Sequence, residues 1–420
     1  MVAAADALEL EARHQLAAMQ DELALGLVSA LEVRDALLQS DLECRRLLDR
    51  VMARSGAQND PFEYKGIVRE STEFFGRQKE IEDFVRRISR GQQVGLYGIH
   101  KIGKSSLIEQ LRRSLHVSHP EFSVLQIELD GQGKSPGDFY HRVLQKLPGV
   151  RDLPSPQMIS SAIFQRLLTE YHSSRTRQRP SHRVILIIDE YPFLLPDLRG
   201  AGGLPGFIEV LGVLKTLHQE GWFSLLPCGR SAALNRQGGW EQGENPFIDL
   251  LHPCFLGPLP RDEMDALVTT LGRRGQLTFE PEALTAIYAE TAGHPSLSRS
   301  LGSQILRNGK GKVGADRVAV AVDEFLKDRD QTAILRAIYE TRMDADEQKI
   351  AQTLAKKGPQ PRTALFPPRS SAPRRRQIRD ALQNLLDTTV LIEQPDERVA
   401  HRYGLLRRVV QREARELGLA

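Results

Sequence analysis

The segment from Gly98 to Ser105, which reads GIHKIGKS, constrains the fold of this chain more than any other part. It satisfies the pattern G-x-x-x-x-G-K-[ST], which binds phosphate groups when it lies between a strand and a helix. A β-prone run, 93–97, precedes the segment, and apolar residues at helical spacing follow it in 105–111. The order of strand, glycine-rich turn and helix therefore predicts a phosphate-binding loop in a parallel α/β sheet.

The chemistry of this loop explains its spacing. Its glycines let successive backbone N–H groups converge on phosphate oxygens, and the positive end of the following helix points to the same place. We expect Lys104 to reach the β- and γ-phosphates of ATP and to support catalysis, and the Ser105 hydroxyl to coordinate Mg²⁺. The residues expected to contact the nucleotide are Gly98, Ile99, His100, Lys101, Ile102, Gly103, Lys104, Ser105 and Ser106.

A second motif, an aliphatic run followed by two acids, supports the prediction of a nucleotide site. The aliphatic run 184–188 ends in Asp189 and Glu190, which is typical of a buried central strand that ends in two carboxylates. We expect Asp189 to hold Mg²⁺ together with Ser105, and Glu190 to orient or deprotonate the attacking water. In the alternative interpretation, the two acids merely face solvent at the end of a core strand.

The composition is that of a soluble globular protein. A chain of 420 residues, 40% hydrophobic and 26% charged, predicts roughly two to four domains. Its cysteines, Cys44, Cys228 and Cys254, are odd in number and lack metal-binding spacing, so we expect free thiols in a reducing cytoplasm. No apolar run approaches the ~18 residues that a membrane span needs. We therefore expect a cytoplasmic protein without a membrane partner.

The chain divides by pattern into four parts. Residues 1–58 predict helices with leucines on one face. Residues 59–258 alternate strand and helix, which predicts an α/β core with a parallel sheet sandwiched by helices. Residues 259–332 predict a helical lid, and residues 333–420 a winged-helix domain. The strands of the core are expected at 94–97, 123–129, 184–188, 223–226 and 254–256.

The winged-helix prediction rests on the order of elements, with helices at 346–354, 362–366 and 373–386, a hairpin in 390–403 and a closing helix at 405–417. The third helix begins with a cluster of arginines, where such a helix contacts DNA: Arg374, Arg375, Arg376 and Arg379. Residues 356–379 hold eight basic and no acidic side chains, whereas residues 1–58 hold ten acidic and six basic ones. The arginines are therefore expected to bind duplex DNA, to pair with the acidic N-terminal segment, or to form only a solvated face.

Four blocks in this order carry a resemblance to a known group. They are FFGRQKEI at 74–81, LYGIHKIGKSSL at 96–107, IIDE at 187–190 and GHP at 293–295. Together they resemble the STAND group of signal-transducing P-loop ATPases. They are equally similar to the archaeal-type ATPases and the origin-recognition initiators of the AAA+ class. The resemblance covers roughly residues 59–420.

The resemblance implies roles for further residues. Gly76 and Arg77 match the block beside the nucleotide base, and Pro295 matches the lid proline near adenine and ribose. Arg230 matches a strand-terminal sensor whose guanidinium contacts the γ-phosphate and supports catalysis. Arg299 matches, less regularly, a lid arginine that faces phosphate. Alternatively, Arg230 is a loop arginine paired with a surface acid, and Pro295 is an ordinary helix-start proline.

The resemblance also implies a function. We expect an ATP- and Mg²⁺-binding, slowly hydrolysing switch in which the lid and the winged helix change their arrangement between ATP and ADP. Self-association on ATP binding is the expected output, with an effector protein encoded nearby and a role in bacterial signalling or defence. The alternative is a DNA-binding AAA+ ATPase that acts in initiation, partitioning or transposition. A third class is a nucleotide-stabilised scaffold without turnover.

Overall fold

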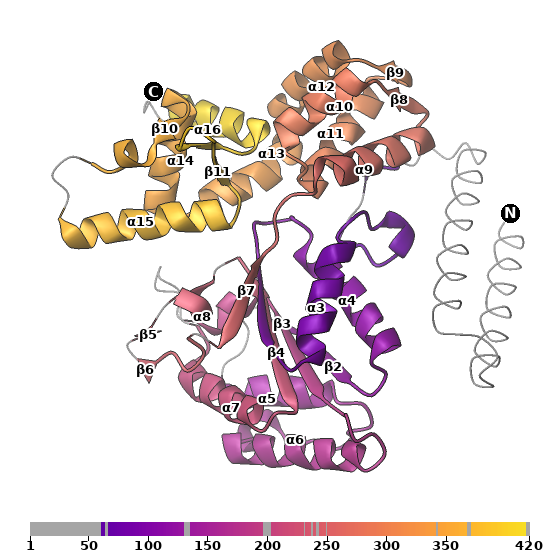
Figure 1. Ribbon diagram of the computed structural model, residues 1–420, viewed down its shortest axis with the longest axis vertical. Helices are drawn as coiled ribbons and strands as arrows, with labels where there is room; N and C mark the ends of the chain where they lie inside the picture. The colour runs from indigo at the N-terminus through magenta and orange to yellow at the C-terminus, as the bar shows by residue number, and fades with distance from the viewer. Residues whose placement is uncertain are drawn as a thin grey trace, which may run out of the picture. The chain divides into compact units, whose positions relative to one another are not determined.

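The computed structural model describes residues 60–416 apart from the short gaps 64–65, 130–134, 196–202, 231, 237, 241–242, 249, 342 and 368–370. The predicted helices of residues 1–58 lie outside the described residues. The chain divides into two units, and the unit that contains residues 60–273 and 277–420 holds every feature described below apart from the last residue of α9 (Figure 1). None of the described helices combines the length and apolar character needed to cross a membrane.

A five-stranded sheet forms the centre of the first part of this unit. Its strand order is β2-β3-β4-β1-β7, and all neighbouring strands run parallel. The strands are β1 (Gln93–Tyr97), β2 (Ser123–Glu128), β3 (Val184–Asp189), β4 (Phe223–Gly229) and β7 (Leu251–Phe255). This confirms the predicted α/β class with its parallel sheet. The sequence signals located all five strands, although β7 begins three residues before the range expected from the sequence.

Helices cover both faces of the sheet (Figure 1). Alternate residues of β3 divide between two cores, because successive side chains of a strand point to opposite faces. Ile185 and Ile187 belong to the core that includes α3 (Gln78–Ser89) and α4 (Lys104–Ser118). Val184, Leu186 and Ile188 pack on the other face against three helices, α5 (Pro136–Gln145), α6 (Ser161–Thr176) and α7 (Phe207–Gln219).

Short elements complete this part. They are the 3₁₀ turns η1 (Ser71–Glu73), η2 (Pro156–Met158) and η3 (Tyr191–Leu194), the helical turn α8 (Ala233–Arg236), and the hairpin of β5 (Gly239–Trp240) and β6 (Gly243–Glu244).

The segment expected to be a helical lid contains four helices. These are α9 (Arg261–Arg274), α10 (Pro281–Thr291), α11 (Pro295–Arg307) and α12 (Ala315–Lys327). The residue patterns of 261–267, 281–292 and 296–306 predict the first three of them. The sequence did not indicate α12. It also did not indicate the parallel pair of β8 (Leu277–Phe279) and β9 (Gly311–Val313), because such short strands carry almost no periodic signal.

The C-terminal segment follows the predicted order of elements. Helix α13 (Arg329–Arg336) and the π-helical turn η4 (Ala337–Thr341) lead into α14 (Ala345–Lys357). Next come β10 (Gln360–Pro361), η5 (Arg362–Leu365), α15 (Ala372–Asp387), β11 (Leu391–Glu393), β12 (Arg398–His401) and α16 (Gly404–Glu416). The three strands form an antiparallel sheet in the order β10-β12-β11. The hydrophobic core of this segment is continuous with the core beneath α3 and α4.

Candidate functional site

The glycine-rich loop lies between β1 and α4, as the sequence predicted. The Gly98 N–H donates to the Gly229 carbonyl at 3.2 Å, which ties the start of the loop to the end of β4. A Cβ at Gly98 would lie 2.9 Å from the Leu256 carbonyl oxygen, so the backbone approach there requires glycine. Gly103 has φ 104, a conformation that side chains disfavour. Ile99 and Ile102 are buried and anchor the loop to the core.

Lys104 is the first residue of α4, and its ammonium group folds back over the loop. Its Nζ donates to the carbonyl oxygens of Gly98 at 3.0 Å and Ile99 at 3.1 Å. The helix N-terminus, with its free N–H groups and positive dipole end, lies at the same point. The arrangement therefore concentrates positive charge and donors at one end of the sheet.

The two motifs meet at Ser105 and Asp189. The Ser105 hydroxyl donates to Asp189 Oδ2 at 2.9 Å, although 84 residues separate them in sequence. Asp189 is 5% exposed, and its Oδ1 accepts the Glu190 N–H at 3.0 Å. This geometry rules out the interpretation in which Asp189 simply faces solvent.

The Ser105–Asp189 pair fits a magnesium ion. One hydroxyl and one carboxylate are the hard oxygen ligands that Mg²⁺ takes when it keeps most of its water. No cluster of three or more His, Cys, Asp or Glu side chains suited to a metal occurs among the described residues. The Ser105 hydroxyl and the Asp189 carboxylate suit an ion that needs few protein ligands.

Cys228 lies on β4, next to the end of β3 that carries Asp189. It is fully buried on β4, and burial together with the neighbouring Asp189 carboxylate raises the pKa of its thiol well above the usual value. The thiol therefore stays protonated. The sequence predicted Cys228 only as a free thiol and carried no signal of its place beside Asp189.

Glu190 follows directly after the end of β3. Its backbone lies in the left-handed region, with φ 52, which non-glycine residues adopt rarely and mostly at functional or strained positions. The residue is half-buried at the carboxyl end of the sheet, one position after the acid that contacts Ser105.

Gly76 and Arg77 link the segment before α3 to the connection between β7 and α9. The Arg77 guanidinium donates to the Gly257 carbonyl at 2.6 Å and to Glu80 Oε1 at 3.1 Å. Burial lowers the pKa of Arg77, and the hydrogen bond and charge of Glu80 oppose that shift. Gly76 has φ 67, a backbone conformation that side chains rarely adopt, so this position also favours glycine.

The start of α11 contacts the phosphate loop directly. His294 Nε2 lies 3.2 Å from the His100 carbonyl oxygen, and the Ser296 hydroxyl donates to the Lys101 carbonyl at 3.0 Å. His294 Nδ1 accepts the Leu297 N–H at 3.3 Å, which places the ring proton on Nε2. Burial lowers the pKa of His294 to about 3, so the ring is neutral. The block GHP at 293–295 supports the family resemblance, but its sequence alone predicted no role for this histidine.

Two other lid residues, Pro295 and Arg299, were also expected to lie near the nucleotide. Pro295 is the first residue of α11, which suits its fixed φ. Arg299 is buried, and its Nη2 donates to the Glu73 carbonyl oxygen at 2.9 Å and lies 3.4 Å from Glu73 Oε2. In this structure Arg299 therefore binds η1. The side chain of Ser106 also points away from the loop and accepts the Val68 N–H at 3.0 Å.

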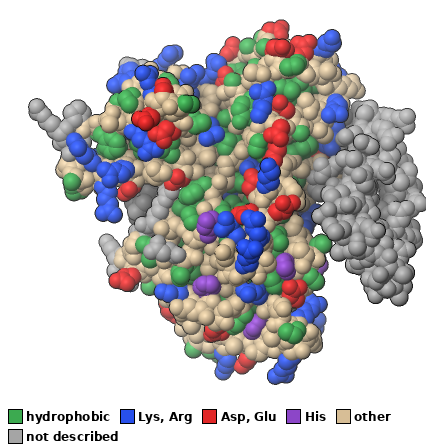
Figure 2. Space-filling view, viewed as in Figure 1, with side chains coloured by type: hydrophobic (Ala, Val, Ile, Leu, Met, Phe, Trp, Pro, Cys, Tyr) green, Lys and Arg blue, Asp and Glu red, His purple; other side chains and the backbone are tan. Residues whose placement is uncertain are grey.

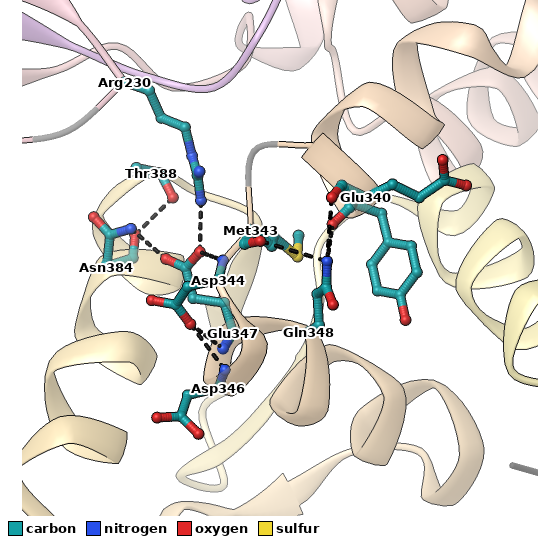
Figure 3. Close-up of polar contacts among 10 residues, drawn as sticks. Arg230, Glu340, Met343, Asp344, Asp346, Glu347, Gln348, Asn384 and Thr388 are labelled. Atoms are coloured by element: carbon teal, nitrogen blue, oxygen red, sulfur yellow. Dashed lines mark hydrogen bonds and ion pairs between the residues drawn. The ribbon is translucent and has the colours of Figure 1, made fainter. Parts of the chain in front are cut away.

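Arg230 follows the last residue of β4, as expected for a strand-terminal position. Its Nη2 donates to Glu347 Oε2 at 2.6 Å (Figure 3). In the alternative interpretation of the sequence, Arg230 pairs with an acidic residue on the protein surface. The acid is instead buried, with its side chain 3% exposed, and it belongs to α14.

The arginine cluster of α15 is mostly exposed. Arg375, Arg376 and Arg379 are exposed, and Lys and Arg side chains gather at this end of the C-terminal segment in Figure 2. Arg374 instead binds the Asp346 carboxylate of α14, with Nη1 2.6 Å from Oδ2. The structure thus keeps three of the four predicted DNA-contacting arginines on the surface.

The sequence and the fold of this chain were compared with those of known proteins. Residues 74–204 match the family model described as Novel STAND NTPase 6. No curated protein sequence matches the chain. The fold is similar to that of the Walker-type ATPase paby2304 of Pyrococcus abyssi, with a TM-score of 0.58, 15% identity, and coverage of 84% of this chain and 99% of that chain. It is also similar to the ORC2 protein of Aeropyrum pernix, solved as ADPNP–ADP complexes, with a TM-score of 0.53, 14% identity, and coverage of 87% and 99%.

These findings confirm the resemblance to STAND and archaeal-type P-loop ATPases. The family match includes the loop and both acids, and the structural likeness establishes the fold over most of the chain. The chain therefore has the fold of a P-loop NTPase of this type.

Proposed function

We propose that this protein is an ATP-binding, slowly hydrolysing molecular switch. The single observation that carries the proposal is the meeting of Ser105 and Asp189 at 2.9 Å beside the Lys104 ammonium group. A phosphate loop, a magnesium-type ligand pair and a second acid at one end of a parallel sheet are the parts that Mg·ATP requires. The Aeropyrum pernix protein of similar fold, solved with ADPNP and ADP, supports the same proposal.

Each residue of the site has a distinct part in the proposed reaction. The N–H groups of the loop bind the phosphates, and Lys104 leaves its carbonyl partners to neutralise the β- and γ-phosphates. Ser105 and Asp189 hold Mg²⁺, which supplies neutralisation of the charge that develops on the transferred phosphoryl group. Glu190 orients the attacking water, and Arg230 contacts the γ-phosphate.

The contact between α11 and the phosphate loop would couple the bound nucleotide to the position of the lid helices. His100 and Lys101 turn their carbonyls to His294 and Ser296, while their N–H groups belong to the loop that binds phosphate. A change of nucleotide that moves these two residues therefore alters the hydrogen bonds of the lid. We propose that the resulting movement leads to self-association and, as the STAND resemblance implies, to action on an effector protein in bacterial signalling or defence. The cytoplasmic location and the winged-helix nature of residues 333–420 stay predictions.

Calorimetry with ATP and Mg²⁺ tests the nucleotide site. The wild-type chain should bind ATP, and Lys104→Ala should not. Glu190→Gln should retain binding and lose hydrolysis, because it keeps the size of the side chain and removes the carboxylate. Gel filtration should show a larger species with ATP than with ADP. Absence of ATP uptake by the wild type would refute the proposal, and turnover that survives Glu190→Gln would refute the role of Glu190.

A second candidate is a DNA-binding AAA+ ATPase. The observation that favours it is the exposure of Arg375, Arg376 and Arg379 in the first turns of α15. Such a helix start is where winged helices contact bases and phosphates. The nucleotide site would have the same composition in both cases, so only DNA binding separates the two candidates.

A further inference from the structure

The buried carboxylate of Glu347 joins the C-terminal segment to the nucleotide-binding part of the fold. Glu347 is the third residue of α14 and closes a capping box. Its Oε2 accepts the Asp344 N–H at 2.9 Å, and its own N–H donates to Asp344 Oδ1 at 2.8 Å (Figure 3). Its Oε1 accepts the Asn384 side-chain amide of α15, and its Oε2 also accepts Arg230 Nη2 at 2.6 Å.

The capping box alone does not require a charge at this position. A neutral glutamine caps a helix in the same way, because only an acceptor oxygen is needed. A carboxylate that is 2% exposed is costly unless a cation pairs with it. Among the described residues, Arg230 is the cation within ion-pair distance of Glu347. The charge of Glu347 therefore serves its contact with Arg230.

Arg230 also lies beside the phosphate loop. It follows Gly229, whose carbonyl accepts the Gly98 N–H at 3.2 Å. Two residues before it, Cys228 lies on β4, next to the strand β3 that ends in Asp189. The backbone of Arg230 thus adjoins the loop that would bind the terminal phosphate of a nucleoside triphosphate, while its guanidinium binds the Glu347 carboxylate. The phosphate and the carboxylate are both anions that accept charge-assisted hydrogen bonds.

We propose that Glu347 determines how strongly this protein discriminates ATP from ADP. The Glu347 carboxylate takes the place of the γ-phosphate as the partner of Arg230. ATP must separate the Arg230–Glu347 pair to gain the guanidinium, whereas ADP binds without disturbing it. Separation of the pair also removes the ion pair that ties α14 to β4, so the γ-phosphate releases the C-terminal segment. This inference rests on the proposed binding of ATP at the loop.

The size of the effect follows from the linkage between two binding events. A contact that ATP must break lowers the affinity for ATP by the same factor by which ATP weakens the contact. Couplings of this kind are on the order of 5- to 150-fold. We therefore expect Glu347→Gln, which keeps the cap and removes the charge, to tighten ATP binding on the order of tenfold and to leave ADP binding unchanged.

Titration of the full-length protein with fluorescent ATP and ADP analogues in the presence of Mg²⁺ tests the proposal. The measured quantity is the ratio of the dissociation constants for ADP and ATP. Asp346→Asn is the matched control, because it removes a carboxylate from the same helical turn that binds Arg374 and not Arg230. We expect the ratio to rise on the order of tenfold in Glu347→Gln and to stay at the wild-type value in Asp346→Asn. Arg230→Ala should abolish the effect of Glu347→Gln.

A ratio that Glu347→Gln leaves unchanged, or changes equally in the Arg230→Ala background, overturns the inference while leaving ATP binding intact. If the wild type binds neither nucleotide, the proposed function fails and the inference fails with it. Hydrogen exchange on the wild type provides a test that does not depend on the folding of a variant. ATP, but not ADP, should speed exchange of the Asp344 amide, which donates to the same Glu347 Oε2 that binds Arg230. Equal exchange with the two nucleotides contradicts the proposal.

Discussion

Acidification should destabilise the contact between α11 and the phosphate loop, and His294 allows the magnitude to be worked out. Its ring is 0% exposed and is held between the Leu297 N–H and the His100 carbonyl, an arrangement that requires the neutral form. Burial is the main cause that lowers its pKa to about 3. An unfolded histidine has a pKa of about 6.5.

The sign of the pH dependence follows from proton binding. Between pH 6.5 and 3 the unfolded chain holds a proton on residue 294 that the folded chain does not hold. The contribution of His294 to the free energy of unfolding is therefore fully present above pH 6.5 and is lost as the pH falls toward 3. The loss is about 1.4 kcal/mol for each pH unit, or about 2 kcal/mol between pH 6.5 and 5. This figure does not depend on the folded pKa as long as that pKa lies below 5.

Urea denaturation at pH 7.5 and pH 5, followed by circular dichroism, measures this loss. His294→Gln should reduce the pH dependence of the unfolding free energy by about 2 kcal/mol relative to the wild type. Burial also lowers the pKa values of His182 and His401 to about 4, so part of the pH dependence should persist in the variant. His116→Gln, which replaces an exposed histidine, is the control. If His294→Gln retains the full pH dependence of the wild type, the reasoning from burial is wrong.

Two further predictions concern the loop and α15. Gly98→Ala should lower the unfolding free energy by about 1–3 kcal/mol, because the new Cβ would press on the Leu256 carbonyl. Gly212→Ala in α7, where a Cβ meets nothing within 4 Å, should instead stabilise by about 0.5–1 kcal/mol, and urea midpoints compare the two. If the protein binds duplex DNA, replacing Arg375, Arg376 and Arg379 by Ala should reduce the slope of log affinity against log salt by about 2.7. Fluorescence anisotropy at two salt concentrations measures that slope, and an unchanged slope excludes these arginines as phosphate contacts.

The sequence by itself determined the parts of this protein whose signal is local. The pattern from Gly98 to Ser105 requires a turn with specific backbone angles, and the aliphatic run before Asp189 suits only a strand buried on both faces. Because parallel strands end at the same edge, these two signals were sufficient to predict that Ser105 and Asp189 approach each other. The five strands of the sheet followed from the same periodicity.

Only the tertiary structure decided which partners the charged and polar side chains have. Arg230 is bonded to Glu347, 117 residues later in the chain, and Arg299 to Glu73, 226 residues earlier. His294 reaches the loop across 194 residues. A guanidinium or an imidazole accepts many partners, so its own sequence neighbourhood does not specify one. The partner is fixed when the hydrophobic core brings distant helices together and burial makes an unpaired polar group costly.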